Sequence, residues 1–110
     1  MANIRKVTNA EEYKNLVNTE GKIVVAKFFA AWCGPCRVLT DTNKNIDPDK
    51  VEDVIFAEVD IENEEFDSLC ADLNIRGIPV LAYYKDGELK EKTTGLQSAD
   101  AIITKVEGLR

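Results

Sequence analysis

A nearly continuous apolar run from Ile23 to Phe29 is followed, after three intervening residues, by the first of two cysteines three positions apart. Such a run, with its β-branched residues, suits a central strand that is covered on both faces. If a helix begins at Cys33, that residue and Cys36 share one helical face, and their sulfurs are close enough to bridge. Free backbone N–H groups at a helix start stabilise a thiolate there. The segment therefore predicts a buried strand followed by a helix that presents a dithiol suited to exchange with other disulfides.

The rest of the chain alternates strand-like and helix-like patterns. A capping box from Thr8 to Glu11 begins a first helix, which Gly21 ends. Further expected elements are a strand at Val54–Ile61, a helix capped by Asn63, strands at Val80–Tyr84 and Leu89–Thr93 around Asp86-Gly87, and a helix capped by Ser98. Counted with a strand ahead of the first helix, the order is β-α-β-α-β-α-β-β-α, which predicts an α/β fold. Its central mixed sheet has parallel strands at the front and an antiparallel hairpin at the edge, flanked by about four helices.

The length and the net charge of the chain limit the classes of protein to which it can belong. A chain of 110 residues without an internal linker fits a single domain over residues 1–110. The net charge of −6 argues against nucleic-acid binding, which favours a basic face. No apolar run is long enough to cross a bilayer, and the N-terminus lacks a signal-peptide core, so we expect no membrane association.

The cysteine count of three, with no histidine, points to a reducing compartment, and we expect a cytoplasmic monomer. Without histidine, no Cys–His or Ser–His nucleophile can form. A metal site is also hard to assemble, because Cys70 is the only sulfur ligand outside the pair. We expect no metal and no bound cofactor. Cys70 lies on an apolar helix stripe, which is typical of a buried small hydrophobe; a regulatory or dimer-forming thiol is the alternative.

Several segments together resemble the thioredoxin family over nearly the whole chain. They are Phe28–Arg37, Asp60, Ile75–Pro79, Tyr84–Glu88 and Gly95. A lone Cys-x-x-Cys is weak evidence, but this first segment followed by Gly-Ile-Pro and then an Asp-Gly hairpin is highly specific. The resemblance implies the thioredoxin fold and a redox-active disulfide. It also implies a protein-disulfide reductase: a thiol–disulfide oxidoreductase that serves electron transport and cell redox homeostasis, acts on disulfide-containing proteins and is re-reduced by a thioredoxin reductase.

The family pattern also implies roles for individual residues. Cys33 is expected to be the exposed nucleophile, and Cys36 the more buried thiol that resolves the mixed disulfide. Pro79 is expected to be cis, with the backbone of Ile78 pairing with the substrate chain. The expected substrate-contacting residues are Trp32, Gly34, Pro35, Ile78, Pro79 and Gly95. From the residues themselves, Gly34 keeps the surface low and Pro35 stiffens the helix start.

Three positions depart from the family pattern. Lys27 stands where the family usually has a buried aspartate behind the dithiol, and Glu58 stands where it often has a lysine. We hypothesise that this pair of reversed sign tunes Cys36, because a charged Lys27 favours the Cys36 thiolate whereas a carboxylate opposes it; a neutral Lys27 could instead accept the proton. A purely structural ion pair is the alternative. Asp41 replaces a helix-bending proline, so we expect a straighter or shorter helix that ends by about Asn45.

The sequence alone leaves three other functions open. The chain could be a disulfide oxidant or isomerase, although the Gly-Pro spacer resembles that of the reducing members. It could be a non-catalytic binding subunit, since thioredoxin-like domains also serve as scaffolds. A dimer in which a metal ion bridges the Cys-x-x-Cys pairs of two chains is a third, minor alternative.

Overall fold

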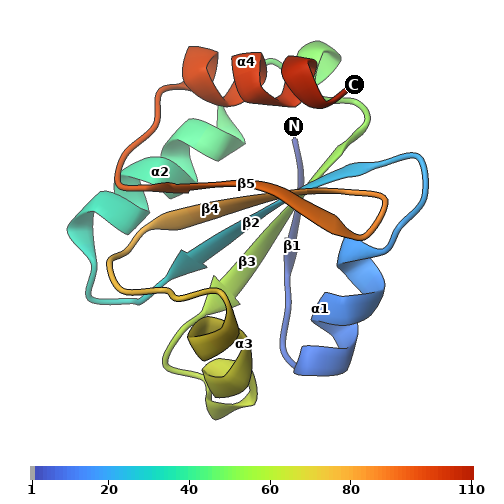
Figure 1. Cartoon of the computed structure of the whole chain (residues 1–110). Coiled ribbons are helices and arrows are strands. Elements are labelled where there is room, and N and C mark those ends of the chain that lie inside the picture. Colours follow the sequence, from blue (N-terminus) through green and yellow to red (C-terminus); the bar gives the residue numbers. More distant parts are fainter. Residues whose placement is uncertain (1) are drawn as a thin grey trace.

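The computed structural model describes residues 2–110 and shows one five-stranded sheet with helices on both faces (Figure 1). The strands are β1 (Asn3–Lys6), β2 (Ile23–Phe29), β3 (Val54–Asp60), β4 (Val80–Lys85) and β5 (Glu88–Thr94). The helices are α1 (Ala10–Val17), α2 (Gly34–Lys44), α3 (Asp67–Asp72) and α4 (Ala99–Leu109), with short 3-10 helices η1 (Pro48–Lys50) and η2 (Glu64–Phe66). The α/β fold class and the expected element order are confirmed.

The sheet is mixed, with the strand order β1-β3-β2-β4-β5. Strands β1 and β2 both pair parallel to β3, whereas β4 runs antiparallel to β2 and to β5. The antiparallel part therefore begins beside the central strand β2. The predicted hairpin turn at Asp86-Gly87 joins β4 to β5, and both of its residues have positive φ, 53° and 80°, the combination that an Asp-Gly turn favours.

Alternating side chains of β2 face two separate apolar layers. One layer lies between the sheet and helices α1 and α3, and includes Tyr13, Phe28 and Phe66. The other lies between the sheet and helices α2 and α4, and includes Leu39 and Ile102. Because β2 is buried on both faces, its apolar run is nearly continuous, as the sequence predicts for a central strand.

Helix α2 begins directly after the first cysteine. Cys33 is its N-cap residue, and Pro35 lies in the first turn, where its missing N–H costs little. The helix continues unbroken through Asp41 to Lys44, and the Asn45 N–H donates to the Asp41 carbonyl at 3.1 Å. The prediction that this helix ends by about Asn45 is confirmed.

One predicted helix start is wrong by a residue. Helix α1 is capped by Asn9, whose side chain accepts from the Glu12 N–H at 2.8 Å, rather than by Thr8. Asparagine and threonine both cap well, so adjacent candidates cannot be separated by residue type alone. Within residues 2–110, no helix combines the length and the hydropathy needed to cross a membrane.

Candidate active site

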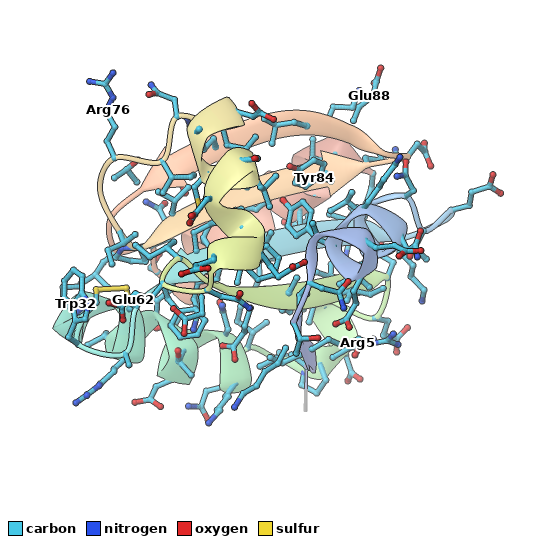
Figure 2. The ribbon with its side chains drawn as sticks, turned by 90° about the horizontal axis from the view of Figure 1, so that it is seen from below. Arg5, Trp32, Glu62, Arg76, Tyr84 and Glu88 are labelled. Atoms are coloured by element: carbon cyan, nitrogen blue, oxygen red, sulfur yellow. A yellow bond between two sulfur atoms is a disulfide. The ribbon has the colours of Figure 1, made fainter. Side chains whose placement is uncertain are left out.

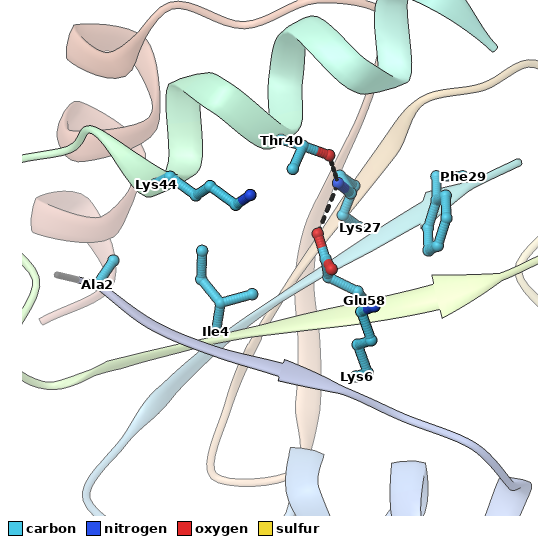
Figure 3. A pocket seen from close by; sticks show the side chains of 8 residues that line it. All are labelled: Ala2, Ile4, Lys6, Lys27, Phe29, Thr40, Lys44 and Glu58. Atoms are coloured by element: carbon cyan, nitrogen blue, oxygen red, sulfur yellow. Dashed lines mark hydrogen bonds and ion pairs between the residues drawn. The ribbon is translucent and has the colours of Figure 1, made fainter. Parts of the chain in front are cut away.

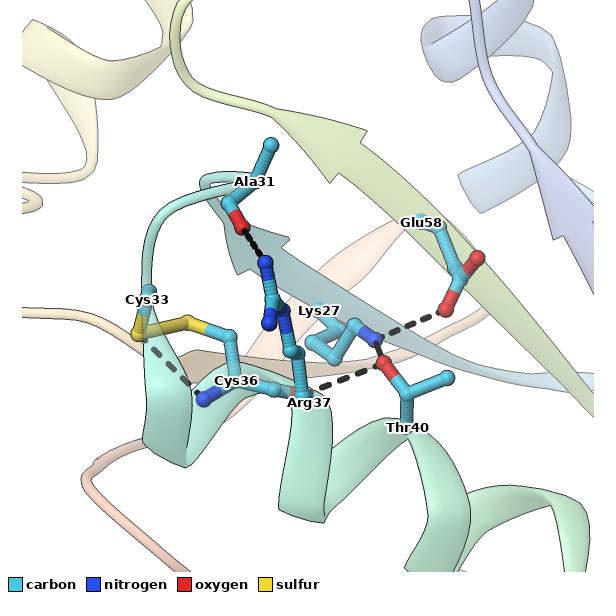
Figure 4. The surroundings of a disulfide bond; sticks show 7 residues. All are labelled: Lys27, Ala31, Cys33, Cys36, Arg37, Thr40 and Glu58. Carbon is cyan, nitrogen blue, oxygen red and sulfur yellow. Dashed lines mark hydrogen bonds and ion pairs between the residues drawn. A yellow bond between two sulfur atoms is a disulfide. The ribbon is translucent and has the colours of Figure 1, made fainter.

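The two cysteines form a disulfide at the start of α2 (Figure 4). Their Cα atoms lie 5.3 Å apart, which is within the usual range for a disulfide. The Cys36 N–H points at the Cys33 sulfur, 3.2 Å away. The first-turn donor expected beside Cys33 is therefore present, and it stabilises negative charge on that sulfur when the bond is reduced.

Cys33 is less exposed than expected. It retains 5% of its accessible surface in this oxidised form, against 2% for Cys36. The order of burial agrees with the expectation, but the description of Cys33 as exposed is wrong for the disulfide state. Ala30 is buried with both cysteines, and Phe29, Ile61 and Ile78 pack against this cluster.

Of the predicted substrate-contacting residues, Trp32, Gly34 and Pro35 adjoin the cysteines in the chain, and Ile78 packs against them from another part of the fold. Trp32 lies beside the disulfide with 67% of its surface exposed (Figure 2), so its ring is free to cover an incoming chain. The Ile78–Pro79 peptide bond is cis, as the resemblance implied. Pro79 is held in turn by Gly95, whose N–H donates to the Pro79 carbonyl at 2.8 Å. The site thus combines an apolar platform with an ordered stretch of backbone.

Arg37 stabilises the loop that precedes the dithiol. Its guanidinium donates to the carbonyl of Ala31 at 2.9 Å. The side chain is exposed, yet it links the first turn of α2 to the end of the preceding loop. This contact fixes the loop segment that carries Trp32.

The charged pair of reversed sign lies behind the disulfide. Lys27 and Glu58 are directly opposite each other in the parallel register of β2 and β3, and the Lys27 ammonium lies 2.7 Å from a Glu58 carboxylate oxygen. The Lys27 side chain is 2% exposed and the Glu58 side chain 11%. The ammonium also lies over the Phe29 ring, 5.0 Å from its centre, which adds a cation–π attraction.

Thr40 connects this pair to the dithiol helix, although it was not among the predicted site residues. Lys27 donates to the Thr40 hydroxyl, and that hydroxyl donates to the Cys36 carbonyl at 3.0 Å (Figure 4). Part of the signal was present in the spacing, because Thr40 follows Cys36 by four residues and stacks one helical turn below it. A continuous polar link therefore runs from Glu58 through Lys27 and Thr40 to the backbone of Cys36.

Cys70 is remote from this chemistry. It is partly buried on α3 and packs against the apolar layer on the opposite side of the sheet from α2. Burial, with a smaller contribution from the Asp67 carboxylate, raises the pKa of the Cys70 thiol. A raised pKa lowers the thiolate fraction at neutral pH, so Cys70 is a poor nucleophile. This environment agrees with its interpretation as a small hydrophobic residue.

The sequence and the fold of this chain both resemble those of known proteins. The family model described as Thioredoxin matches residues 4–108. The chain is 33% identical to the thioredoxin of Mycoplasmoides gallisepticum over 84% of its own length and 88% of that protein, and 31% identical to the thioredoxin of Coprinus comatus over 84% and 85%. Among solved structures, a point mutant of the thioredoxin from Halobacterium salinarum is 28% identical and superposes with a TM-score of 0.84, covering 96% of this chain and 89% of that one.

Proposed function

Because this chain belongs to the thioredoxin family and is a thiol–disulfide oxidoreductase of the protein-disulfide reductase kind, we propose that Cys33 and Cys36 carry its electrons. The observation that carries the proposal is the disulfide at the N-terminus of α2, in which the Cys36 N–H faces the Cys33 sulfur. We further propose that residues 1–110 form one thioredoxin domain, supported by the family match over residues 4–108.

The proposed reaction transfers two electrons from the dithiol to a substrate disulfide. The Cys33 thiolate attacks one sulfur of the substrate; the substrate S–S bond breaks, and its other sulfur leaves as a thiolate that takes up a proton. The Cys36 thiolate then attacks the Cys33 sulfur and displaces the second substrate sulfur. The products are a reduced substrate dithiol and the Cys33–Cys36 disulfide, which is the state of this structure.

Substrate recognition is assigned to the surface around the disulfide. The exposed Trp32 ring offers an apolar contact, while Gly34 and Pro35 keep the helix start narrow enough for a second sulfur to approach. Ile78 and Pro79 supply backbone groups on the other side, ordered by the Gly95 hydrogen bond. Backbone pairing beside the cysteines suits an extended protein segment and is tolerant of its sequence.

A thioredoxin reductase is the proposed electron donor, and protein disulfides are the proposed substrates. We assign the protein to the cytoplasm as a monomer. The unpaired Cys70 supports a reducing compartment, because exposed or partly exposed free thiols persist there.

The test is reduction of the insulin disulfides, followed by turbidity, with and without a thioredoxin reductase and its reductant. We expect rapid reduction that depends on both proteins. Failure of every reductase tried, with normal activity when the protein is reduced by dithiothreitol, would contradict the proposed donor alone. Failure with dithiothreitol as well would contradict the electron-carrier role and favour the scaffold interpretation.

We also propose that Lys27 and Glu58 tune the resolving thiol. The support is the polar link from Lys27 through the Thr40 hydroxyl to the Cys36 carbonyl, on the helix that carries both cysteines. A positive charge behind Cys36 favours its thiolate, and the thiolate is the form that attacks the mixed disulfide. Lys27 is thus assigned as a positioning and tuning residue rather than as a group that touches the substrate.

Replacing Lys27 by methionine, in a chain that also carries Glu58→Leu to avoid a lone buried carboxylate, should slow resolution of the mixed disulfide by roughly threefold to tenfold at pH 7. The physical reason is loss of the ammonium, which the Thr40 link connects to Cys36, whereas the Glu58 carboxylate lies beyond it and opposes the thiolate less. The rate is measured by single-turnover quench, and its pH profile should move to higher pH. An unchanged profile would leave the pair with a structural role only.

A further inference from the structure

A pocket of about 470 Å³ opens beside the charged pair, on the face of the sheet that α2 covers (Figure 3). It is lined by Ala2, Ile4, Lys6, Lys27, Phe29, Thr40, Lys44 and Glu58. Ala2, Ile4 and Phe29 give it an apolar side, and the other residues give it a polar floor and mouth. Its volume lies within the range of pockets that bind small organic ligands.

Cationic side chains dominate this pocket, although the chain as a whole carries a net charge of −6. Three lysines and one glutamate line it. Lys6 and Lys44 are exposed, and neither forms an ion pair with any residue of the range 2–110. Figure 3 shows the Lys44 side chain extending from α2 over the pocket. The pocket is therefore an electropositive site in an acidic protein, which favours an anion.

Two unused hydrogen-bonding positions lie on the pocket floor. The Lys27 ammonium has three N–H donors, and within residues 2–110 only the Thr40 hydroxyl and one Glu58 oxygen accept from it. The second Glu58 oxygen meets no donor from the same residues. Lys27 is 2% exposed and lines the pocket, so its third N–H, which has only the Phe29 ring nearby, is a donor available to an acceptor inside the cavity.

We propose that this pocket binds a phosphate monoester with a small organic body. Phosphate oxygens accept from the Lys27 ammonium at the floor and from Lys6 and Lys44 at the mouth. In its monoanionic form a phosphate ester retains one O–H, which donates to the free Glu58 oxygen. The organic body packs against the apolar side at Ile4 and Phe29.

The glutamate selects among anions of similar size. A sulfate or a simple carboxylate at neutral pH has only acceptor oxygens, and these face the Glu58 carboxylate with no proton between them. A phosphate group has a second pKa near neutrality, so it can supply both acceptors and one donor. The lysines alone would attract any of these anions, whereas the combination with Glu58 discriminates in favour of the one that carries a hydroxyl.

The experiment is a titration of the ¹⁵N-labelled full chain with glycerol 3-phosphate, compared with inorganic phosphate and with sulfate at constant ionic strength. We expect saturable shifts of the backbone amides of Ile4, Lys6 and Lys44. Sulfate should bind about fivefold or more weakly than either phosphate, because it lacks the donor to Glu58. Glycerol 3-phosphate should bind more tightly than inorganic phosphate, because its organic body uses the apolar side.

Lys6→Gln and Lys44→Gln should each weaken binding of glycerol 3-phosphate by roughly threefold to tenfold. The matched control is Lys14→Gln, which removes an exposed lysine on α1, on the other side of the sheet, and should leave the affinity unchanged. The proposal is overturned if no saturation is seen up to about 100 mM, if sulfate binds as well as phosphate, or if Lys14→Gln weakens binding as much as the pocket variants do.

Discussion

Replacing Cys33 by serine should lower the rate of protein-disulfide reduction by at least about a thousandfold, because a hydroxyl cannot form the mixed disulfide on which both steps depend. The measurement is insulin reduction with a thioredoxin reductase or with dithiothreitol as the electron source. The Cys33→Ser variant should fold normally, since the side chain lies at a helix N-cap, where serine is a preferred residue. A variant that keeps a tenth of the wild-type rate would contradict the assignment of Cys33 as nucleophile.

Two companion variants separate the roles of the three thiols. Cys36→Ser should stop the reaction after the first step and leave a covalent adduct between Cys33 and the substrate, visible by mass spectrometry under non-reducing conditions. Cys70→Ser should keep the rate within about twofold of wild type, because burial makes this thiol a poor nucleophile and it lies on the far side of the sheet. An adduct formed through Cys70 would contradict this division of labour.

Glu58→Leu should reduce the free energy of unfolding by about 3 kcal/mol, the second large effect expected for this chain. The change leaves the Lys27 ammonium, 2% exposed, with the Thr40 hydroxyl and the Phe29 ring but without its counter-charge. A pocket opens beside Lys27, and water that entered it would moderate the cost. The quantity is obtained from urea denaturation curves, read as the free energy extrapolated to zero urea.

The double variant Lys27→Met, Glu58→Leu is the control for this prediction. It replaces both charges by apolar side chains of similar length, so no unpaired charge remains, and its stability should lie within about 1 kcal/mol of wild type. If the double variant is as unstable as Glu58→Leu, the loss arises from packing rather than from an isolated ammonium. If Glu58→Leu itself costs less than about 1 kcal/mol, the pair is not desolvated as its burial indicates.

Much of the fold could be predicted because local patterns and long-range packing agree. The continuous apolar run of β2 reflects its burial on both faces, and the Asp86-Gly87 turn is set by the positive φ values that these two residues tolerate. The dithiol site could be predicted equally well, since Cys33 and Cys36 lie on one helical turn. Their distance depends on the local helix and hardly on the rest of the chain.

Only some of the contacts behind the dithiol could be predicted from the sequence. The pairing of Lys27 with Glu58 was expected from the positions that they occupy in the family pattern, and it is confirmed by their 2.7 Å contact. The contact of Thr40 with Lys27 could not be predicted, because it depends on the rotation of α2 over the sheet, which no local pattern specifies. The low exposure of Cys33 and the pocket beside Lys27 likewise arise from how separate elements close on one another.

The strand register of Lys27 and Glu58 also constrains how this sequence can have arisen. The family pattern that this chain resembles usually has an aspartate at the position of Lys27 and often a lysine at that of Glu58, and in this chain the two facing side chains are largely buried. Changing either residue alone passes through two like charges in contact, which costs several kcal/mol in a buried setting. An inversion that passes through an uncharged residue at one of the two positions avoids that cost. Related sequences that carry only one of the two charges should therefore have an apolar or amide side chain at the facing position.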